Sequence, residues 1–295
     1  MSKRLCFAPL IFCFSTTLPA APLLYSLGTG DGMVYSLVEF DRHGNETTLF
    51  GVGLGYNGGL AFDPSANSFY AIYNDMSGLS NMASISWDGV VSDAMPLGEG
   101  FYGGLTYAGS PGQFWAVGAG RTGIQNHLYS IDLPGASVTG VTQLGDGDTF
   151  FDGGITTIPD LIHGTSLALI GVTYLERGQF TNLYTYSPLT DRFALDGIYR
   201  SLIFPAAGGL AADWGRLNYW AIAIDPETFQ PILVNFDGAG VNTQFTLTQA
   251  YSGLTYAERQ GDPPPPPPEP VPEPGTYLTV AAGFTLMALF KRRRA

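Results

Sequence analysis

A short phrase of two small residues followed by an apolar residue recurs five times along this chain. Four copies begin Gly-Gly and the last begins Ser-Gly, and the copies lie at 58–62, 103–107, 153–157, 208–212 and 252–256. Their starts are 45, 50, 55 and 44 residues apart, which is the length of a four-stranded propeller blade. The repeat therefore predicts five blades around a common axis.

Each phrase is followed by segments with strand composition. Apolar and mostly aromatic-rich second strands are expected at 69–72, 114–117, 167–170 and 219–222, and third strands at 83–86, 128–131, 183–186 and 233–236. Asp-Gly pairs such as Asp88-Gly89 favour hairpin turns, because glycine tolerates positive φ. A fourth strand then leads to the next phrase, as at 90–98 and 138–145. The pattern is typical of an all-β domain.

The first and last segments of the domain complete one another. No strand follows the fifth phrase, whereas three strand-like segments at 24–27, 34–37 and 47–52 precede the first. We expect the last blade to take its inner strand from 250–258 and its outer three strands from 23–53, which closes the ring. The sequence thus predicts an all-β, five-bladed β-propeller over 21–259, whose last blade is closed by N- and C-terminal strands.

The glycines have a structural explanation, since inner strands crowd around the axis and absent side chains allow close approach. After them, apolar and small residues alternate, as in Leu60-Ala61 and Leu105-Thr106. We expect the apolar side chains to pack between blades and the small ones to face a narrow channel.

The N-terminus has the features of a signal peptide over 1–20. Lys3 and Arg4 precede a short apolar stretch, which is expected to be the signal helix, and small residues around Ala20 suit cleavage. Both cysteines, Cys6 and Cys13, lie within this stretch. Its removal leaves a chain without cysteine and therefore without disulfides. An uncleaved N-terminal anchor is the alternative.

The C-terminal 36 residues have three parts. A proline-rich linker over 260–271 precedes Pro272, Glu273 and Pro274, and residues 276–290 carry no charge. The chain ends in a basic cluster, which is Lys291, Arg292, Arg293 and Arg294. We expect 276–290 to be a transmembrane helix, with the basic end cytoplasmic by the positive-inside rule.

This order of motif, apolar segment and arginine cluster resembles the PEP-CTERM sorting signal of Gram-negative bacteria, here over 272–295. The resemblance implies export, handling by signal peptidase and an exosortase, and transient anchoring in the inner membrane. It also implies a final place at the cell surface or outside the cell, in the exopolysaccharide matrix of a biofilm. A plain C-terminal anchor is the alternative, but it gives the Pro-Glu-Pro element no role.

The charge between the two ends excludes one class of partner. Residues 21–274 hold all 25 acidic residues and only 7 basic ones, all arginine, so their net charge is 7 − 25 = −18. Nucleic-acid binding depends on neutralising phosphates with basic side chains. The sequence therefore predicts no nucleic-acid partner.

The residue before each phrase is expected at one mouth of the channel, and those residues are Asn57, Tyr102, Asp152, Ala207 and Tyr251. Four of them (Asn57, Tyr102, Asp152 and Tyr251) suit a shallow polar and aromatic ligand site, because tyrosine can stack on a sugar face and donate a hydrogen bond. Packing of the two tyrosines in the core is the alternative.

Few residues suggest catalysis. Asp146, Asp148 and Asp152 form a weak calcium candidate that lacks the EF-hand pattern, and no other cofactor is indicated. His43, His127 and His163 fall in three different blades. We therefore expect a non-catalytic module that binds or scaffolds polysaccharide or a surface protein. The alternatives are a glycoside hydrolase with carboxylates at the funnel and a matrix component with no specific ligand.

Overall fold

The computed structural model describes most of the chain between residues 23 and 257, which lie between the two predicted terminal signals in the sequence. The described residues are 23–29, 34–41, 43–53, 58–75, 77–99, 104–119, 126–144, 149–151, 154–160, 164–175, 178–195, 206–213, 218–237 and 240–257. Pro22–Gln260 forms one compact unit. The predicted signal peptide, proline-rich linker, sorting motif and transmembrane helix lie outside the described residues. Within these ranges, no helix has the length and apolar character needed to cross a bilayer.

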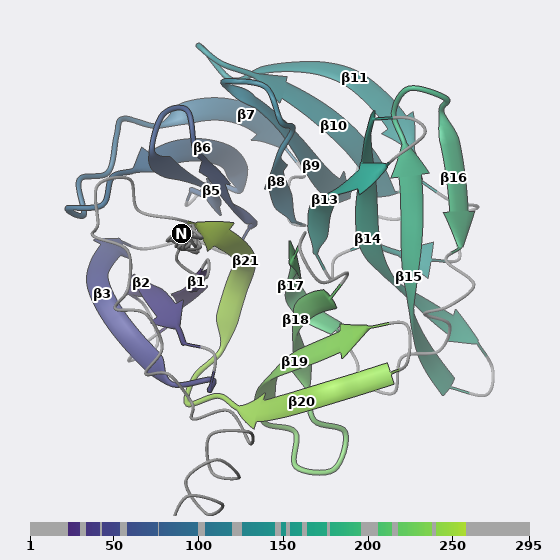
Figure 1. Ribbon diagram of the computed structural model, residues 1–295. Coiled ribbons are helices and arrows are strands. Elements are labelled where there is room, and N and C mark those ends of the chain that lie inside the picture. The colour runs from purple at the N-terminus through teal and green to yellow at the C-terminus, as the bar shows by residue number, and fades with distance from the viewer. Residues whose placement is uncertain are drawn as a thin grey trace, which may run out of the picture. The chain divides into compact units, whose positions relative to one another are not determined.

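Five antiparallel sheets surround a common axis, as predicted (Figure 1). We number the blades along the chain and call the split one the closing blade. Blade 1 contains β4 (Leu60–Asp63), β5 (Ser68–Asn74), β6 (Leu79–Ile85) and β7 (Met95–Glu99). Blade 2 contains β8 (Leu105–Tyr107), β9 (Gln113–Ala119), β10 (Asn126–Asp132) and β11 (Ser137–Gln143). Blade 4 contains β17 (Ala206–Asp213), β18 (Asn218–Ile224), β19 (Pro231–Asp237) and β20 (Gly240–Thr246).

The closing blade joins the two ends of the domain, which confirms the predicted ring closure. Its strand order is β21 (Tyr251–Ala257), β1 (Leu23–Gly28), β2 (Tyr35–Phe40) and β3 (Glu46–Gly53). β21 runs antiparallel to β1, with Leu23 opposite Ala257 and Gly28 opposite Tyr251. Figure 1 shows the last strand lying beside the first. This pairing removes the two free sheet edges that an open ring would leave.

Blade 3 departs from the four-stranded prediction. Its strands are β12 (Thr149–Phe150), β13 (Ile155–Asp160), β14 (Gly164–Leu175), β15 (Gly178–Ser187) and β16 (Arg192–Leu195). β12 and β13 both pair with β14, because β14 and β15 continue as a longer hairpin than their counterparts in the other blades.

A second difference concerns the strand predicted at 90–98 in blade 1. Only an isolated bridge joins Ile85 to Val91, and the regular strand β7 begins at Met95.

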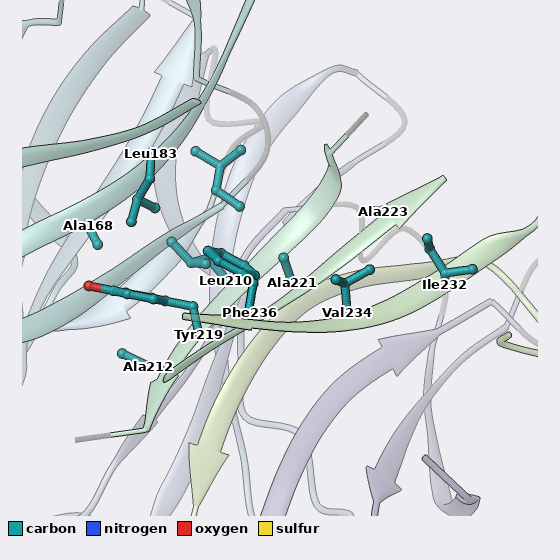
Figure 2. Close-up of a cluster of buried hydrophobic side chains, with 11 residues drawn as sticks. Ala168, Leu183, Leu210, Ala212, Tyr219, Ala221, Ala223, Ile232, Val234 and Phe236 are labelled. Atoms are coloured by element: carbon teal, nitrogen blue, oxygen red, sulfur yellow. The ribbon is translucent and has the colours of Figure 1, made fainter. Parts of the chain in front are cut away.

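The core lies between the blades rather than inside any one sheet. Figure 2 shows the cluster between blades 3 and 4, where Leu183 faces Leu210 and Phe236. The rings of Tyr219 and Phe236 stack there with centroids 5.4 Å apart. A second aromatic cluster joins the closing blade to blade 1, where Trp87 meets Tyr25, Phe62 and Phe69. Burial of these faces is the main force that holds neighbouring blades together.

The prediction that small inner-strand residues face the channel is wrong. Leu60 packs between the closing blade and blade 1, whereas its neighbour Ala61 packs between blades 1 and 2. Leu210 and Ala211 divide in the same way between the two sides of blade 4. The reason is that each sheet stands radially, so successive side chains point to its two neighbouring blades. The axis is therefore lined by strand edges and not by sheet faces.

Candidate functional site

The inner strands meet at a ring of glycines, one from each blade. The ring consists of the second small residue of each phrase, namely Gly59, Gly104, Gly154, Gly209 and Gly253. A Cβ atom added at any of them would lie 3.0 Å or less from an atom of the next inner strand. At Gly59 the nearest atom is the backbone nitrogen of Leu105, at 1.9 Å. The prediction that these glycines permit close approach is confirmed.

The ring closes where the two ends of the domain meet. A Cβ atom at Gly253 would lie 2.4 Å from the backbone nitrogen of Leu60, which belongs to blade 1. The Ser252 hydroxyl donates to the Gly58 carbonyl, so the serine that replaces glycine in the fifth phrase bonds to the first phrase. From the other side, the buried Ser26 hydroxyl of β1 donates to the Gly253 carbonyl. Polar bonds therefore join β21 to blade 1 and to β1 within its own blade.

Tyr251 is the one predicted mouth residue whose side chain the structure describes. The side chain is 5% exposed, and its ring lies edge-on to Phe40 with centroids 5.1 Å apart. Its hydroxyl donates to the Glu46 carboxylate at 2.5 Å. The Tyr251 ring is thus occupied by core contacts, as in the packing alternative, and it offers no open face for a sugar.

The Tyr251 hydroxyl acts as a hydrogen-bond donor. Burial raises the pKa of this phenol, and the bond to Glu46 raises it further, because both disfavour a phenolate. The same carboxylate accepts from the backbone N–H of Thr248 at 2.8 Å and from its hydroxyl. At neutral pH this phenol stays protonated, and the group of residues connects β3 to the segment that enters β21. These hydrogen bonds therefore give Tyr251 and Glu46 a structural role.

The structure does not describe the side chains of the other residues predicted for the channel mouth and the calcium site. Asn57, Tyr102 and Asp152 lie outside the described residues, as do the calcium candidates Asp146 and Asp148. For Ala207 the structure describes the backbone in β17 only. The structure therefore places one member of the predicted mouth site and does not test the rest.

The histidines that the structure describes lie in different blades. His43 is exposed in the turn between β2 and β3, His127 lies on β10 in blade 2, and His163 lies outside the described residues. Throughout the described ranges, no three His, Cys, Asp or Glu side chains are grouped so that they could hold a metal ion.

The Asp63-Pro64 pair is typical of a turn, but Asp63 is 1% exposed. One carboxylate oxygen accepts from the Ser65 backbone at 2.8 Å and from the Ser65 hydroxyl at 2.6 Å. The other accepts from the backbone N–H of Gly112, which belongs to blade 2, at 3.1 Å. Asp63 therefore joins two blades. Its Asp-Pro context signalled only the turn.

A second polar contact between blades lies near the axis. The backbone N–H of Thr157, on the inner strand of blade 3, donates to the Thr106 hydroxyl of blade 2 at 3.2 Å. This N–H belongs to the strand edge that faces away from β14, so it has no partner within its own sheet. A threonine of the neighbouring blade supplies the missing acceptor.

Comparison with known proteins identifies the fold. The sequence matches no protein-family model and no curated protein. Among solved structures, TolB from Acinetobacter baumannii is similar at 13% identity with a TM-score of 0.52, and the match covers 81% of this chain and 57% of that chain. A gluconolactonase from Xanthomonas campestris is similar at 11% identity with a TM-score of 0.47, covering 83% of this chain and 78% of that one. At 13% identity, the similarity to TolB supports the β-propeller fold and says nothing about activity.

Proposed function

We propose that this chain is an exported, exosortase-sorted protein whose propeller binds or scaffolds the exopolysaccharide matrix without catalysis. The observation that carries the proposal is the order of the last 24 residues, namely Pro272-Glu273-Pro274, the uncharged stretch 276–290 and the terminal basic cluster. Signal peptidase would act near Ala20 and an exosortase near the Pro-Glu-Pro motif. The protein would pass through a stage anchored in the inner membrane and end at the cell surface or outside the cell.

The properties of the propeller domain are compatible with a location at the cell surface or outside the cell. A closed ring fixed by backbone contacts and blade-to-blade bonds can withstand extracellular conditions without disulfides, and the chain has no cysteine beyond residue 13. A net charge of −18 over residues 21–274 keeps the exported part solvated. The scaffold would then present its loops to a polysaccharide or a surface protein.

Sorting is tested in a host that has an exosortase. The full chain should lose its tail there and move from the inner membrane to the surface or the medium. The paired substitution Glu273→Ala with Pro274→Ala should remain in the inner membrane at full length. A control with Glu269→Ala, in the linker, should behave like the natural chain. Equal distribution of all three proteins would contradict sorting by this motif.

Binding is tested with the processed protein on a glycan array and on polysaccharide extracted from the host. Retention on at least one acidic or neutral polysaccharide is expected, with no release of reducing ends. Release of reducing ends would favour the glycoside-hydrolase alternative, and its loss in Asp152→Asn would assign the carboxylate. Absence of both binding and hydrolysis would leave the matrix component without a ligand and refute this part of the proposal.

A further inference from the structure

The outermost strand of each blade leaves one row of backbone N–H and C=O groups without a partner in its own sheet. Such edges invite pairing with another strand, and proteins commonly guard them with charge, proline or irregular register. Three outer strands here carry a guard. β7 contains Pro96, β16 has four residues and begins at Arg192, and β3 begins at Glu46 and has two register shifts.

β20 carries no such guard over Thr243–Thr246. Its sequence, Gly-Val-Asn-Thr-Gln-Phe-Thr, contains neither charge nor proline, and every residue except Phe245 is exposed. Its one register irregularity lies near its start, opposite Asn235 and Phe236, so that Thr243–Thr246 pairs regularly with β19. β11 is similarly uncharged, but its register shifts in the middle of the strand. The longest regular unguarded edge among the described strands is therefore that of β20.

The register of β20 shows which of its groups are free to pair. The backbone N–H of Leu247 donates to the Pro231 carbonyl at 2.8 Å, so Leu247 occupies a hydrogen-bonded position of the ladder with β19. In an antiparallel pair such positions alternate, which places Phe245 in the next one. The N–H and C=O groups of the alternate residues, Gln244 and Thr246, consequently point away from β19, and both residues are exposed.

The chemistry of this edge selects its partner. A charged peptide would find no countercharge on β20, whereas a second copy of β20 is matched to it in antiparallel register centred on Gln244. In that register Gln244 lies opposite Gln244 of the other copy, and Asn242 lies opposite Thr246. The two Gln244 side chains can exchange hydrogen bonds, and the Thr246 hydroxyl can donate to the Asn242 oxygen, since the Asn242 amide nitrogen already donates to Asn235 and Asp237. No like charges on β20 oppose one another.

We propose that β20 is a self-association edge, through which two copies of this chain form one continuous antiparallel sheet across a twofold axis. The strongly acidic domains repel one another at long range, while the edge itself is neutral. Salt screens that repulsion, with a Debye length of about 10 Å at 0.1 M. Association therefore strengthens as ionic strength rises, opposite to the behaviour of an interface held by ion pairs.

The test measures the molar mass of the full chain in mild detergent by light scattering, at low and high salt. The natural chain should be dimeric at high salt and should dissociate at low salt. Gln244→Pro removes an outward N–H without touching the ladder to β19 and should be monomeric, whereas Gln244→Ala keeps that N–H and should still dimerise. A matched lysine pair separates the two uncharged edges, because Gln244→Lys should dissociate the dimer and Gln143→Lys, on β11, should not.

A cross-linking experiment tests the register and does not depend on the proline variant folding. In a chain with Cys6→Ser and Cys13→Ser, Gln244→Cys should form an intermolecular disulfide under mild oxidation. Thr243→Cys should not, because Thr243 lies opposite Phe245 of the other copy. A natural chain that stays monomeric at high salt, a Gln244→Pro variant that dimerises as well as the natural chain, or equal cross-linking of both cysteines would overturn the proposal.

Discussion

The glycine ring around the axis makes a sharp prediction for Gly59→Ala. The added Cβ would lie 1.9 Å from the Leu105 nitrogen and 2.5 Å from the Gly104 carbonyl carbon, whereas Cβ atoms essentially never approach a neighbour within 3.0 Å. The backbone of blade 2 would have to retreat by more than 1 Å, and no side-chain rotation can relieve a backbone clash. Because Gly59 does not need positive φ, the cost is purely steric.

Overpacking of a tight core costs about 1–3 kcal/mol, and we expect the upper end here because the obstacle is backbone. For a domain of this size, about 3 kcal/mol corresponds to a fall in melting temperature of roughly 6–12 °C. The assay is urea and thermal unfolding of the purified chain, followed by tryptophan fluorescence and circular dichroism.

The matched control for this prediction is Gly51→Ala, on the outer strand β3. Its Cβ would meet only a methyl carbon of Val34 at 3.7 Å, an ordinary contact, so its stability should stay within about 0.5 kcal/mol of the natural chain. If Gly59→Ala were as stable as Gly51→Ala, the inner strands would not be in backbone contact, and the account of the ring would be refuted.

Three further substitutions test the polar bonds between distant segments. Tyr251→Phe should lower the free energy of unfolding by about 1–2 kcal/mol at neutral pH, because the Glu46 carboxylate loses a donor. The folded state raises the pKa of Tyr251 above its ordinary value near 10, so this residue's stabilisation is complete below about pH 10 and declines as the pH rises further. Denaturant titrations from pH 8 to 11 should therefore show a shallower alkaline loss in Tyr251→Phe than in the natural chain, and identical slopes would contradict the buried donor. Thr106→Val keeps the side-chain shape but leaves the Thr157 N–H without its acceptor, so a loss of about 1–3 kcal/mol in urea unfolding is expected, and a neutral result would show that another acceptor serves. Asp63→Ala removes a buried acceptor of four hydrogen bonds and should cost about 2–4 kcal/mol, measured by thermal unfolding, with Asp225→Ala in an exposed turn as the milder control.

Local sequence patterns were sufficient to predict the closing blade. Strand composition, turn residues and the spacing of the glycine phrases are all local properties, and together they predicted five blades and the pairing of β21 with β1. They did so because a repeat fixes its own topology once its period is known, and because a missing strand at one end had to be supplied at the other.

The contacts of the candidate site, in contrast, could not be predicted from the sequence. Tyr251 was identified by its position before the fifth phrase, but its partner Glu46 lies 205 residues earlier in the chain. No local pattern contains such a pair, since the contact exists only after the two ends of the domain have been brought together in the closing blade. The same holds for Asp63 with Gly112 and for Thr106 with Thr157, which join neighbouring blades.

By itself, the sequence determined that the domain is built from five repeats of strands, and that glycine is required where the repeats converge, because periodicity and backbone freedom are encoded residue by residue. Tertiary structure alone decided where each side chain points. A strand's alternation divides its residues between two faces, but only the radial stance of the sheets makes both faces of the inner strands contacts between blades. The radial arrangement of the sheets therefore places Ala61 in the core and not in the channel. The tertiary structure also buries Tyr251 and gives it a structural role.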